Sequence, residues 1–125
     1  MNEDALPDLF RLAKNISKHS EYHIKMGAVL VRHGKPLSVG FNKIKSHTKW
    51  SVYPRQTIHA EVSALISSGV TDLRGCTMFI YRERNGNPAM ARPCSNCMKV
   101  LKSFGIRRIY YTTNTYPYFE VEKVR

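Results

Sequence analysis

The strongest signal in this sequence comes from two short stretches, His59-Ala60-Glu61 and Pro93-Cys94-Ser95-Asn96-Cys97. Together they offer one imidazole, two thiols and one unpaired carboxylate. Catalytic zinc is usually held by three protein ligands with the fourth position left to water, whereas a structural zinc is closed by four. We therefore predict one Zn²⁺ per chain, with His59, Cys94 and Cys97 as its ligands. We expect Glu61 to stay unligated and to move protons.

The first of these stretches is expected to open a helix. Apolar residues recur after it at helical spacing, and Thr57 is a candidate cap. Residues two apart do not share a helix face, so His59 and Glu61 can reach one metal only at the open amino end of that helix. The positive end of the helix dipole would favour thiolate charge at the same place.

The second stretch is expected to open another helix. Cys94 and Cys97 are three residues apart and therefore share a helix face. An apolar stripe continues from Met98 to Phe104 and stops at Gly105, a natural carboxyl-end cap. The amino ends of both helices should therefore converge on the metal.

The remaining patterns alternate strands and helices, which predicts the fold class α/β: a three-layer α/β/α sandwich with a mixed sheet of four to five strands. Apolar residues at helical spacing from Leu6 to Ile16 indicate a first helix. Residues 42–56 and 82–92 are expected to be long loops. Strands are expected at residues 26–31, 37–41, 76–81 and 106–112, with a hairpin at His33-Gly34-Lys35.

The carboxyl end carries a further strand signal, because Phe119 and Val121 alternate with glutamates. Only residues 113–118 connect this segment to the preceding strand. A parallel return needs a crossover of about a dozen residues or more, so a fifth strand here should run antiparallel to its neighbour. The alternative is a tail that packs on the surface.

Length and cysteine use indicate how the chain is organised. A chain of 125 residues fits one domain, residues 1–125, with a single core. No run approaches roughly 18 apolar residues, and Asn2-Glu3-Asp4 is not the start of a secretory signal, so we expect a cytoplasmic protein with no membrane partner. Two of the three cysteines lie in Cys-x-x-Cys, which argues against a disulfide framework. Cys76 is either a fourth zinc ligand or a small core residue, and its place at the start of an apolar run favours the core.

The pairing of H-x-E with P-C-x-x-C resembles the signature of the zinc-dependent cytidine and deoxycytidylate deaminase superfamily, and roughly residues 26 to 113 follow the superfamily's order. The resemblance implies a single cytidine deaminase-like catalytic domain that hydrolytically deaminates cytosine to uracil. It places His59, Cys94 and Cys97 on the superfamily's zinc ligands and Glu61 on its general acid/base.

The same resemblance implies contacts with the substrate. Asn42 resembles an asparagine that follows the second strand and hydrogen-bonds the substrate sugar, and the alternative is a loop turn or cap. The backbone amides of Ala60 and Cys94 would hold the pyrimidine edge by analogy. An antiparallel fifth strand would resemble the free-nucleoside and toxin-type members more than the deoxycytidylate and polynucleotide-editing members, which carry an extra helix there.

Net charge and its distribution indicate a substrate that carries phosphate. The chain has a formal net charge of +11, with no aspartate or glutamate between Glu21 and Glu61 or between Glu83 and Glu120. These acid-free stretches contain both predicted loops and most of the motif. Such a field attracts phosphate, whether of one nucleotide or of a strand. The basic residues expected to rim the metal are Lys43, Lys45, Lys49, Arg55, Arg82, Arg84 and Arg92.

Aromatic residues in the first predicted loop favour a strand over a single nucleotide. Trp50 and Tyr53 lie among its basic residues, and such side chains stack on bases. We therefore expect single-stranded nucleic acid as the partner and cytosine in single-stranded DNA as the substrate. The alternative is a phosphorylated cytosine nucleotide such as deoxycytidylate (dCMP), because dCMP deaminases resemble this chain in their long loops before the motif. Trp50 packed under its own loop would also fit the pattern.

Two hypotheses without catalysis remain. One is a zinc-stabilised nucleic-acid-binding module, and the other is a protein-interaction domain whose basic surface binds an acidic partner. Neither needs an unligated carboxylate beside the metal, so Glu61 argues against both. The oligomeric state does not follow from the sequence.

Overall fold

Helices and strands alternate along the chain, and the computed structural model describes residues 7–21, 24–44 and 57–124. The helices are α1 (Asp8–Ser17), α2 (Ala60–Ser68) and α3 (Ser95–Ser103). The strands are β1 (Lys25–Arg32), β2 (Lys35–Phe41), β3 (Lys43–Ile44), β4 (Thr57–Ile58), β5 (Thr77–Arg84), β6 (Asn87–Pro88), β7 (Arg108–Thr112) and β8 (Phe119–Lys123).

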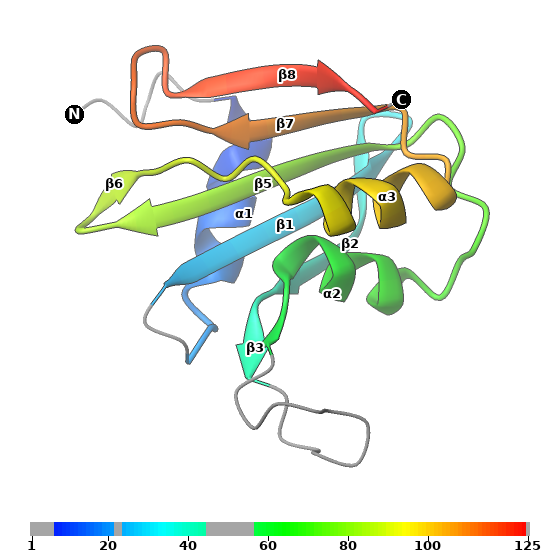
Figure 1. Ribbon diagram of the computed structural model, residues 1–125, viewed down its shortest axis with the longest axis horizontal. Coiled ribbons are helices and arrows are strands. Elements are labelled where there is room, and N and C mark those ends of the chain that lie inside the picture. Colours follow the sequence, from blue (N-terminus) through cyan, green and yellow to red (C-terminus); the bar gives the residue numbers. More distant parts are fainter. Residues whose placement is uncertain (1–6, 22–23, 45–56, 125) are drawn as a thin grey trace.

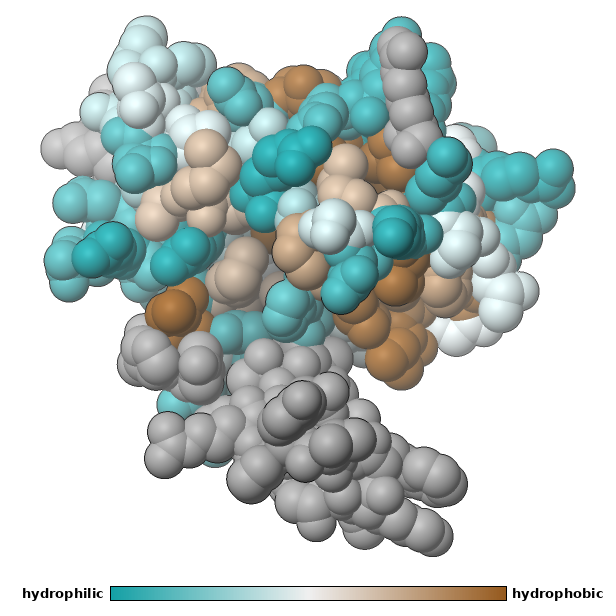
Figure 2. Space-filling model, in the orientation of Figure 1, coloured by the Kyte–Doolittle hydropathy of each residue, from teal (hydrophilic) through white to brown (hydrophobic). Residues whose placement is uncertain are grey.

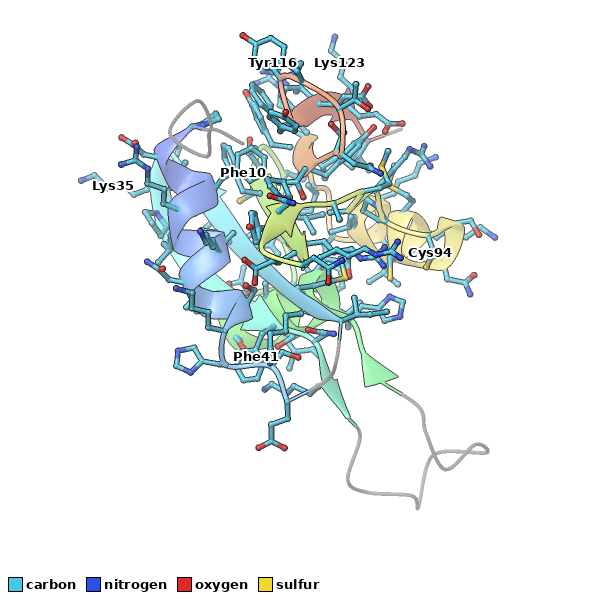
Figure 3. All side chains as sticks on the ribbon, turned by 90° about the vertical axis from the view of Figure 1, so that its left-hand side faces the viewer. Phe10, Lys35, Phe41, Cys94, Tyr116 and Lys123 are labelled. Atoms are coloured by element: carbon cyan, nitrogen blue, oxygen red, sulfur yellow. The ribbon has the colours of Figure 1, made fainter. Side chains whose placement is uncertain are left out.

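A mixed sheet forms the middle layer, with its main strands in the order β2-β1-β5-β7-β8 (Figure 1). Among the described strands only β5 and β7 pair in parallel, and α3 lies in the crossover between them. The short β6 adds a sixth strand by pairing with β5. Helix α1 covers one face, and α2 and α3 cover the other, so Phe10 and Cys94 lie on opposite sides of the sheet (Figure 3). The predicted three-layer α/β sandwich is confirmed.

Two hydrophobic cores fill the spaces between the layers, and strand alternation assigns each residue to one of them. The core under α1 contains Phe10, Ala13, Val29, Val31, Phe79 and Tyr81. The core under α2 and α3 includes Ala28, Leu30, Ala64, Leu65, Met78, Ile80 and Leu101. Even-numbered positions of β5 therefore face α2 and α3, while odd-numbered positions face α1.

Two glycines allow the helices to approach the sheet closely. A Cβ atom at Gly27 would overlap the backbone oxygen of Ala13 in α1. A Cβ atom at Gly40 would overlap the backbone nitrogen of Ala64 in α2. Both strands therefore need a residue without a side chain at these points. The Gly40 contact fixes the distance of α2 from the sheet, and α2 carries half of the predicted metal site.

The predicted loops are shorter than expected, because strand pairing continues into both. Residues 42–56 were expected to be a loop, but Lys43 pairs with Ile58, and Ile44 pairs with Thr57, as β3 and β4. Within the second predicted loop, β5 runs on to Arg84 and turns through Asn85-Gly86 into β6. Polar residues at these strand ends hid the pairing from the sequence pattern.

The carboxyl-end strand is confirmed together with its direction. Strand β8 pairs antiparallel with β7, from Thr112 opposite Phe119 to Arg108 opposite Lys123. The strand expected at residues 106–112 starts at Arg108, two residues later than predicted. The described helices include none long and apolar enough to cross a membrane. The face seen in Figure 2 is mostly hydrophilic, with scattered hydrophobic residues over α2 and α3.

Candidate metal centre

The first predicted ligand lies at the amino end of α2. His59 is the N-cap residue, with an extended backbone (φ −71°, ψ 153°), and its carbonyl oxygen accepts the first helical hydrogen bond from Ser63 at 2.9 Å. The prediction of Thr57 as the cap is wrong, because Thr57 pairs with Ile44 in β4 and the helix starts two residues later. Glu61 lies in the first turn, next to the cap.

The second pair of ligands lies at the amino end of α3 in the same geometry. Cys94 is the N-cap residue, with φ −67° and ψ 167°, and its carbonyl oxygen accepts a hydrogen bond from Met98 at 2.9 Å. Cys97 follows one turn later and is buried. Neither side chain makes a capping hydrogen bond to its own helix, so the His59 imidazole and the Cys94 thiol are available to bind a metal ion. The two helix amino ends converge, as predicted.

The three predicted ligands lie close enough together to share one ion. The nitrogen donor of His59 and the sulfur atoms of Cys94 and Cys97 all lie within 4.8 Å of one another. Donor atoms bound tetrahedrally to zinc at 2.0–2.3 Å lie roughly 3.5 to 4 Å apart, so only small side-chain adjustments are needed. His59 Nδ1 is already 3.0 Å from Cys97 Sγ. One imidazole and two thiols are a donor set that zinc prefers.

A buried carboxylate completes this group. The Glu61 side chain is almost fully buried, and its Oε1 lies 3.9 Å from His59 Nδ1 with no hydrogen-bond partner among the described residues. Burial raises the pKa of Glu61 above its ordinary value of 4.5, although its own backbone N–H and the nearby His59 act in the opposite direction. A buried acid whose oxygen lacks a partner is typical of a proton-transfer group.

The buried thiol behaves in the same way. Burial raises the pKa of the Cys97 thiol, and the nearby Glu61 carboxylate raises it further. Two acidic groups that share one small site therefore both disfavour their anionic forms. A divalent cation between the donors would remove this penalty for both, because a bound metal is the largest local charge and deprotonates its thiol ligands. The electrostatics of the site thus fit a zinc ion.

Cys76 does not belong to the metal cluster. Its side chain is 1% exposed and lies in the core under α2 and α3, just before β5. Among the described residues, the group placed to hold a metal consists of His59, Cys94 and Cys97. The prediction of Cys76 as a core residue agrees with this position, and three protein ligands leave a coordination position for water.

Asn42 holds the backbone in front of β1. Its Oδ1 accepts a hydrogen bond from the backbone N–H of Met26 at 2.9 Å, and its Nδ2 donates to the carbonyl oxygen of Ile24 at 2.5 Å. The carbonyl oxygen of Asn42 accepts a further bond from the hydroxyl of Ser20 at 2.8 Å. The structure thus favours the alternative in which Asn42 organises a turn, and contact with a substrate sugar stays a prediction.

The predicted basic and aromatic contacts separate into three groups. Lys45, Lys49, Trp50, Tyr53 and Arg55 lie outside the described residues. Lys43 is described, and its Nζ lies 4.9 Å from the ring centre of Phe41. Arg84 lies at the exposed end of β5, and Ala60 is buried at the start of α2, where its backbone was expected to act.

Arg92 forms an ion pair within the fold, and its contact with substrate phosphate stays a prediction. It was expected to contact substrate phosphate, but its Nε and Nη2 atoms donate to the two carboxylate oxygens of Glu122 at 2.9 and 2.8 Å. This pairing raises the pKa of Arg92 and lowers the pKa of Glu122. The sequence pattern placed Glu122 in a strand but indicated no role for it near the site. The available signal was an acidic strand, residues 119–123, that follows a long acid-free stretch.

Solved structures with a similar fold include two deaminases. The cytidine deaminase of Burkholderia pseudomallei superposes with a TM-score of 0.70 at 22% identity, covering 99% of this chain and 94% of that one. The dCMP deaminase of cyanophage S-TIM5, in complex with dCMP and dUMP, superposes with a TM-score of 0.63 at 21% identity, covering 90% of this chain and 84% of that one. At these identities the likeness concerns the fold.

Sequence comparison extends the likeness to a family. Human deoxycytidylate deaminase is 24% identical over 106 residues, which cover 74% of this chain and 54% of the human protein. The chain thus aligns with about half the length of that relative. The sequence profile of the cytidine and deoxycytidylate deaminase zinc-binding region matches residues 4–113, which include all three candidate ligands and Glu61. The chain therefore belongs to the zinc-binding cytidine and deoxycytidylate deaminase family.

Proposed function

We propose that this protein hydrolytically deaminates the cytosine base of a free nucleotide to uracil, with deoxycytidylate as the substrate class. The observation that carries the proposal is the convergence of His59, Cys94 and Cys97 beside the buried carboxylate of Glu61, whose Oε1 has no hydrogen-bond partner among the described residues. Three ligands and one nearby acid are what this reaction needs. The non-catalytic alternatives have no use for that acid.

The balanced reaction converts cytosine and water to uracil and ammonia. His59, Cys94 and Cys97 would hold the zinc ion, which would lower the pKa of a bound water molecule and so activate it near neutral pH. Glu61 would carry both protons of the water, one to the ring nitrogen N3 and one to the amino group, which leaves as ammonia. Burial raises the pKa of Glu61, so its side chain holds a proton more readily than an exposed carboxyl group does. The backbone at Ala60 borders the base at the start of α2.

The relatives favour a free nucleotide over a strand. The cyanophage enzyme is described in complex with dCMP and dUMP, and the human relative is a deoxycytidylate deaminase. Our first expectation, cytosine in single-stranded DNA, depended on Trp50 and Tyr53 among the basic residues of one loop. Both aromatic residues lie outside the described residues. The antiparallel β8 resembles the free-nucleoside members instead, so deoxycytidine is the main competitor among small substrates. The two named relatives and the positive charge lead us to rank the nucleotide first.

A polynucleotide substrate remains the second candidate because of charge. The formal net charge is +11, and the two acid-free stretches surround the motif. A strand-binding enzyme contacts several phosphates, so its affinity should fall with salt, at a log-log slope of about 0.7 per phosphate neutralised on single strands. A mononucleotide enzyme lacks this multi-phosphate slope.

We also propose that residues 1–125 act as one catalytic unit in a reducing, cytoplasmic setting. Cys94 and Cys97 must be reduced thiols to bind zinc, and all three cysteines are free. Zinc content measured under reducing and oxidising conditions tests this point. Loss of zinc on oxidation is expected.

One assay separates the candidates. Equal cytosine concentrations are offered as deoxycytidine, dCMP, dCTP, single-stranded DNA, duplex DNA and RNA, and uracil formation is measured at two salt concentrations. We expect the highest kcat/KM for dCMP. Turnover of single-stranded DNA without turnover of dCMP would favour the hypothesis of a polynucleotide substrate. No uracil from any substrate, with zinc bound, would refute the proposed deamination.

A further inference from the structure

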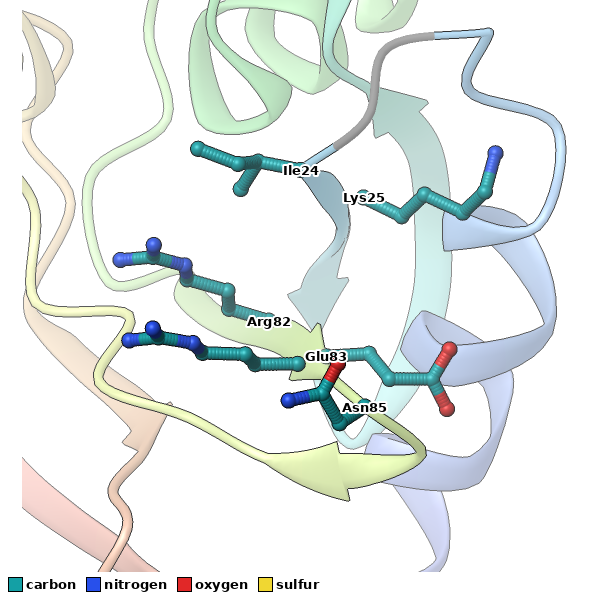
Figure 4. A pocket seen from close by; sticks show the side chains of 6 residues that line it. Ile24, Lys25, Arg82, Glu83 and Asn85 are labelled. Atoms are coloured by element: carbon teal, nitrogen blue, oxygen red, sulfur yellow. The ribbon is translucent and has the colours of Figure 1, made fainter.

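Two arginines near the end of β5 lie on the same face of the sheet as the metal centre. Met78 and Ile80 belong to the core under α2 and α3. Side chains alternate along a strand, so Arg82 and Arg84 continue the row of these two residues. Glu83 belongs to the opposite face, toward α1. Figure 4 shows the Arg82 side chain extending to one side of β5 and the Glu83 side chain to the other.

These arginines line a cavity of about 560 Å³ at the start of β1. The other residues that line it are Ile24, Lys25, Glu83 and Asn85. Ile24 lies on the Arg82 side, whereas Lys25 points the other way (Figure 4), where its ammonium donates to the carbonyl oxygen of Ser20. The positive charge on the Arg82 side therefore comes from the two guanidinium groups.

The cavity lies beside the segment that leads to the metal ligands. Arg82 pairs with Met26 across β5 and β1, and Asn42 bonds the backbone of both Met26 and Ile24. The Arg82 guanidinium also donates to the carbonyl oxygen of Met90 at 3.3 Å, four residues before Cys94. The cavity wall is therefore joined to the segment that leads to Cys94.

At least one hydrogen-bond donor of this arginine pair has no acceptor among the described residues. The Nε atom of Arg82 is buried and has no hydrogen-bond partner among the described residues. Ion pairs occupy Arg74, with Asp72, and Arg92, with Glu122. The structure gives no such pair to Arg82 or Arg84 within the residues it describes. A buried guanidinium N–H without an acceptor is costly, so an anionic ligand is the group this site lacks.

We infer that Arg82 and Arg84 bind the phosphate group of a cytosine nucleoside monophosphate. Planar guanidinium groups match the spacing of phosphate oxygens, and two of them on one strand face can hold one dianion. This inference rests on the proposed function, and it adds a specific consequence. The pair makes the enzyme select dCMP over deoxycytidine, which carries the same base and sugar without phosphate.

The test compares dCMP with deoxycytidine in the wild type and in Arg82→Gln, Arg84→Gln and the double variant. The readout is the ratio of kcat/KM for dCMP to kcat/KM for deoxycytidine. Each charge-assisted hydrogen bond lost should reduce this ratio by about 10- to 100-fold. Arg84→Lys keeps the positive charge but lacks the planar, two-point guanidinium geometry, so it should give an intermediate ratio. A purely structural role would lower both kcat/KM values together and leave the ratio unchanged, which would overturn the inference.

Arg107→Gln is the matched control. It makes the same change of charge at an exposed residue just before β7, at the opposite end of the sheet. The dCMP-to-deoxycytidine ratio should match the wild type in this variant. An equal fall in the ratio for Arg107→Gln would mean that net charge alone sets the preference, and the Arg82 and Arg84 site would be rejected.

A separate binding experiment tests this inference independently of the proposed activity. Inorganic phosphate and dUMP are titrated while the thermal unfolding midpoint is measured for the wild type and the double variant. Stabilisation of the wild type alone supports the anion site even if no deamination is detected. Equal turnover of dCMP and deoxycytidine by the wild type would leave the deaminase proposal standing and overturn the phosphate site.

Discussion

Arg92 and Glu122 form a two-point salt bridge, with donor-acceptor distances of 2.9 and 2.8 Å, between the segment before Cys94 and strand β8. The hydroxyl of Tyr111 lies 3.3 Å from the same carboxylate and 2.9 Å from Glu120. The family profile ends at residue 113, before β8 begins. A strand beyond the matched region therefore holds the loop that carries a metal ligand.

Replacing Glu122 should make the protein less stable only above acidic pH. Arg92 holds the pKa of Glu122 below its ordinary value of 4.5. The contribution of the pair is therefore present above about pH 4.5 and is lost as pH falls through the lowered pKa of the folded state. Urea unfolding midpoints of the wild type and Glu122→Gln should differ at pH 7 and converge near the acid limit. Arg92 is exposed and Glu122 is partly exposed, so a small difference is expected.

Glu120→Gln is the control for this comparison, because it removes a carboxylate on the same strand that does not pair with Arg92. Its unfolding midpoint should follow that of the wild type more closely than Glu122→Gln does. A difference between the wild type and Glu122→Gln that persists unchanged to low pH would contradict the assigned ion pair.

Glu61→Gln should stop turnover while zinc stays bound. The residue is assigned to proton transfer and not to the metal, so kcat should fall by at least about 10²- to 10⁴-fold. Zinc per chain, measured by atomic spectroscopy, should equal that of the wild type. Loss of zinc from this variant would show that Glu61 is a metal ligand and would contradict its assignment as the proton carrier.

Without metal, the protein should become less stable as pH rises, because of the buried Glu61. Burial raises the pKa of Glu61 above 4.5, so the folded metal-free protein binds more protons than the unfolded chain. Its free energy of unfolding should therefore decrease as pH rises from about 4.5 through the raised pKa. Glu61→Gln, which cannot ionise, should remove this slope. A metal-free wild type whose stability does not decrease over that range would refute the stated effect of burial.

The three cysteines should respond differently to removal. Cys94→Ala and Cys97→Ala should lose zinc and unfold at a lower temperature, because metal binding is coupled to folding. Cys76→Ala should keep zinc and lose roughly 0.5 to 3 kcal/mol of stability, as expected for a small change in the core. Zinc content and thermal midpoints with and without a chelator measure both effects. Zinc loss from Cys76→Ala would mean a fourth protein ligand and a closed site.

Two glycine substitutions should separate general stability from the metal site. Alanine at Gly40 would push α2 away from the sheet, and alanine at Gly27 would push α1 away from the opposite face. Each overlap should cost about 1 to 3 kcal/mol or more. Only Gly40→Ala should weaken zinc retention in chelator competition, because α2 carries His59 and Glu61. Equal zinc retention in both variants would show that the α2 position does not control the site.

The sequence by itself determined the metal donors, the helix ends that present them and the α/β class. These features depend on short-range spacing: His59 with Glu61 at a helix start, and Cys94 with Cys97 one turn apart. The direction of β8 was also predictable, because the connection before it is too short for a parallel return. A chain-length constraint of this kind needs no knowledge of packing.

Only the tertiary structure decided what the polar side chains contact. Arg92 pairs with Glu122, which lies 30 residues away along the chain, through a strand register that composition does not reveal. Asn42 hydrogen-bonds the backbone of Ile24 and Met26, and the family resemblance had indicated only a contact with the substrate sugar. Arg82 lies on the metal-bearing face because β5 continues beyond its apolar core. Each outcome depends on which distant segments the sheet brings together, and local sequence does not encode that pairing.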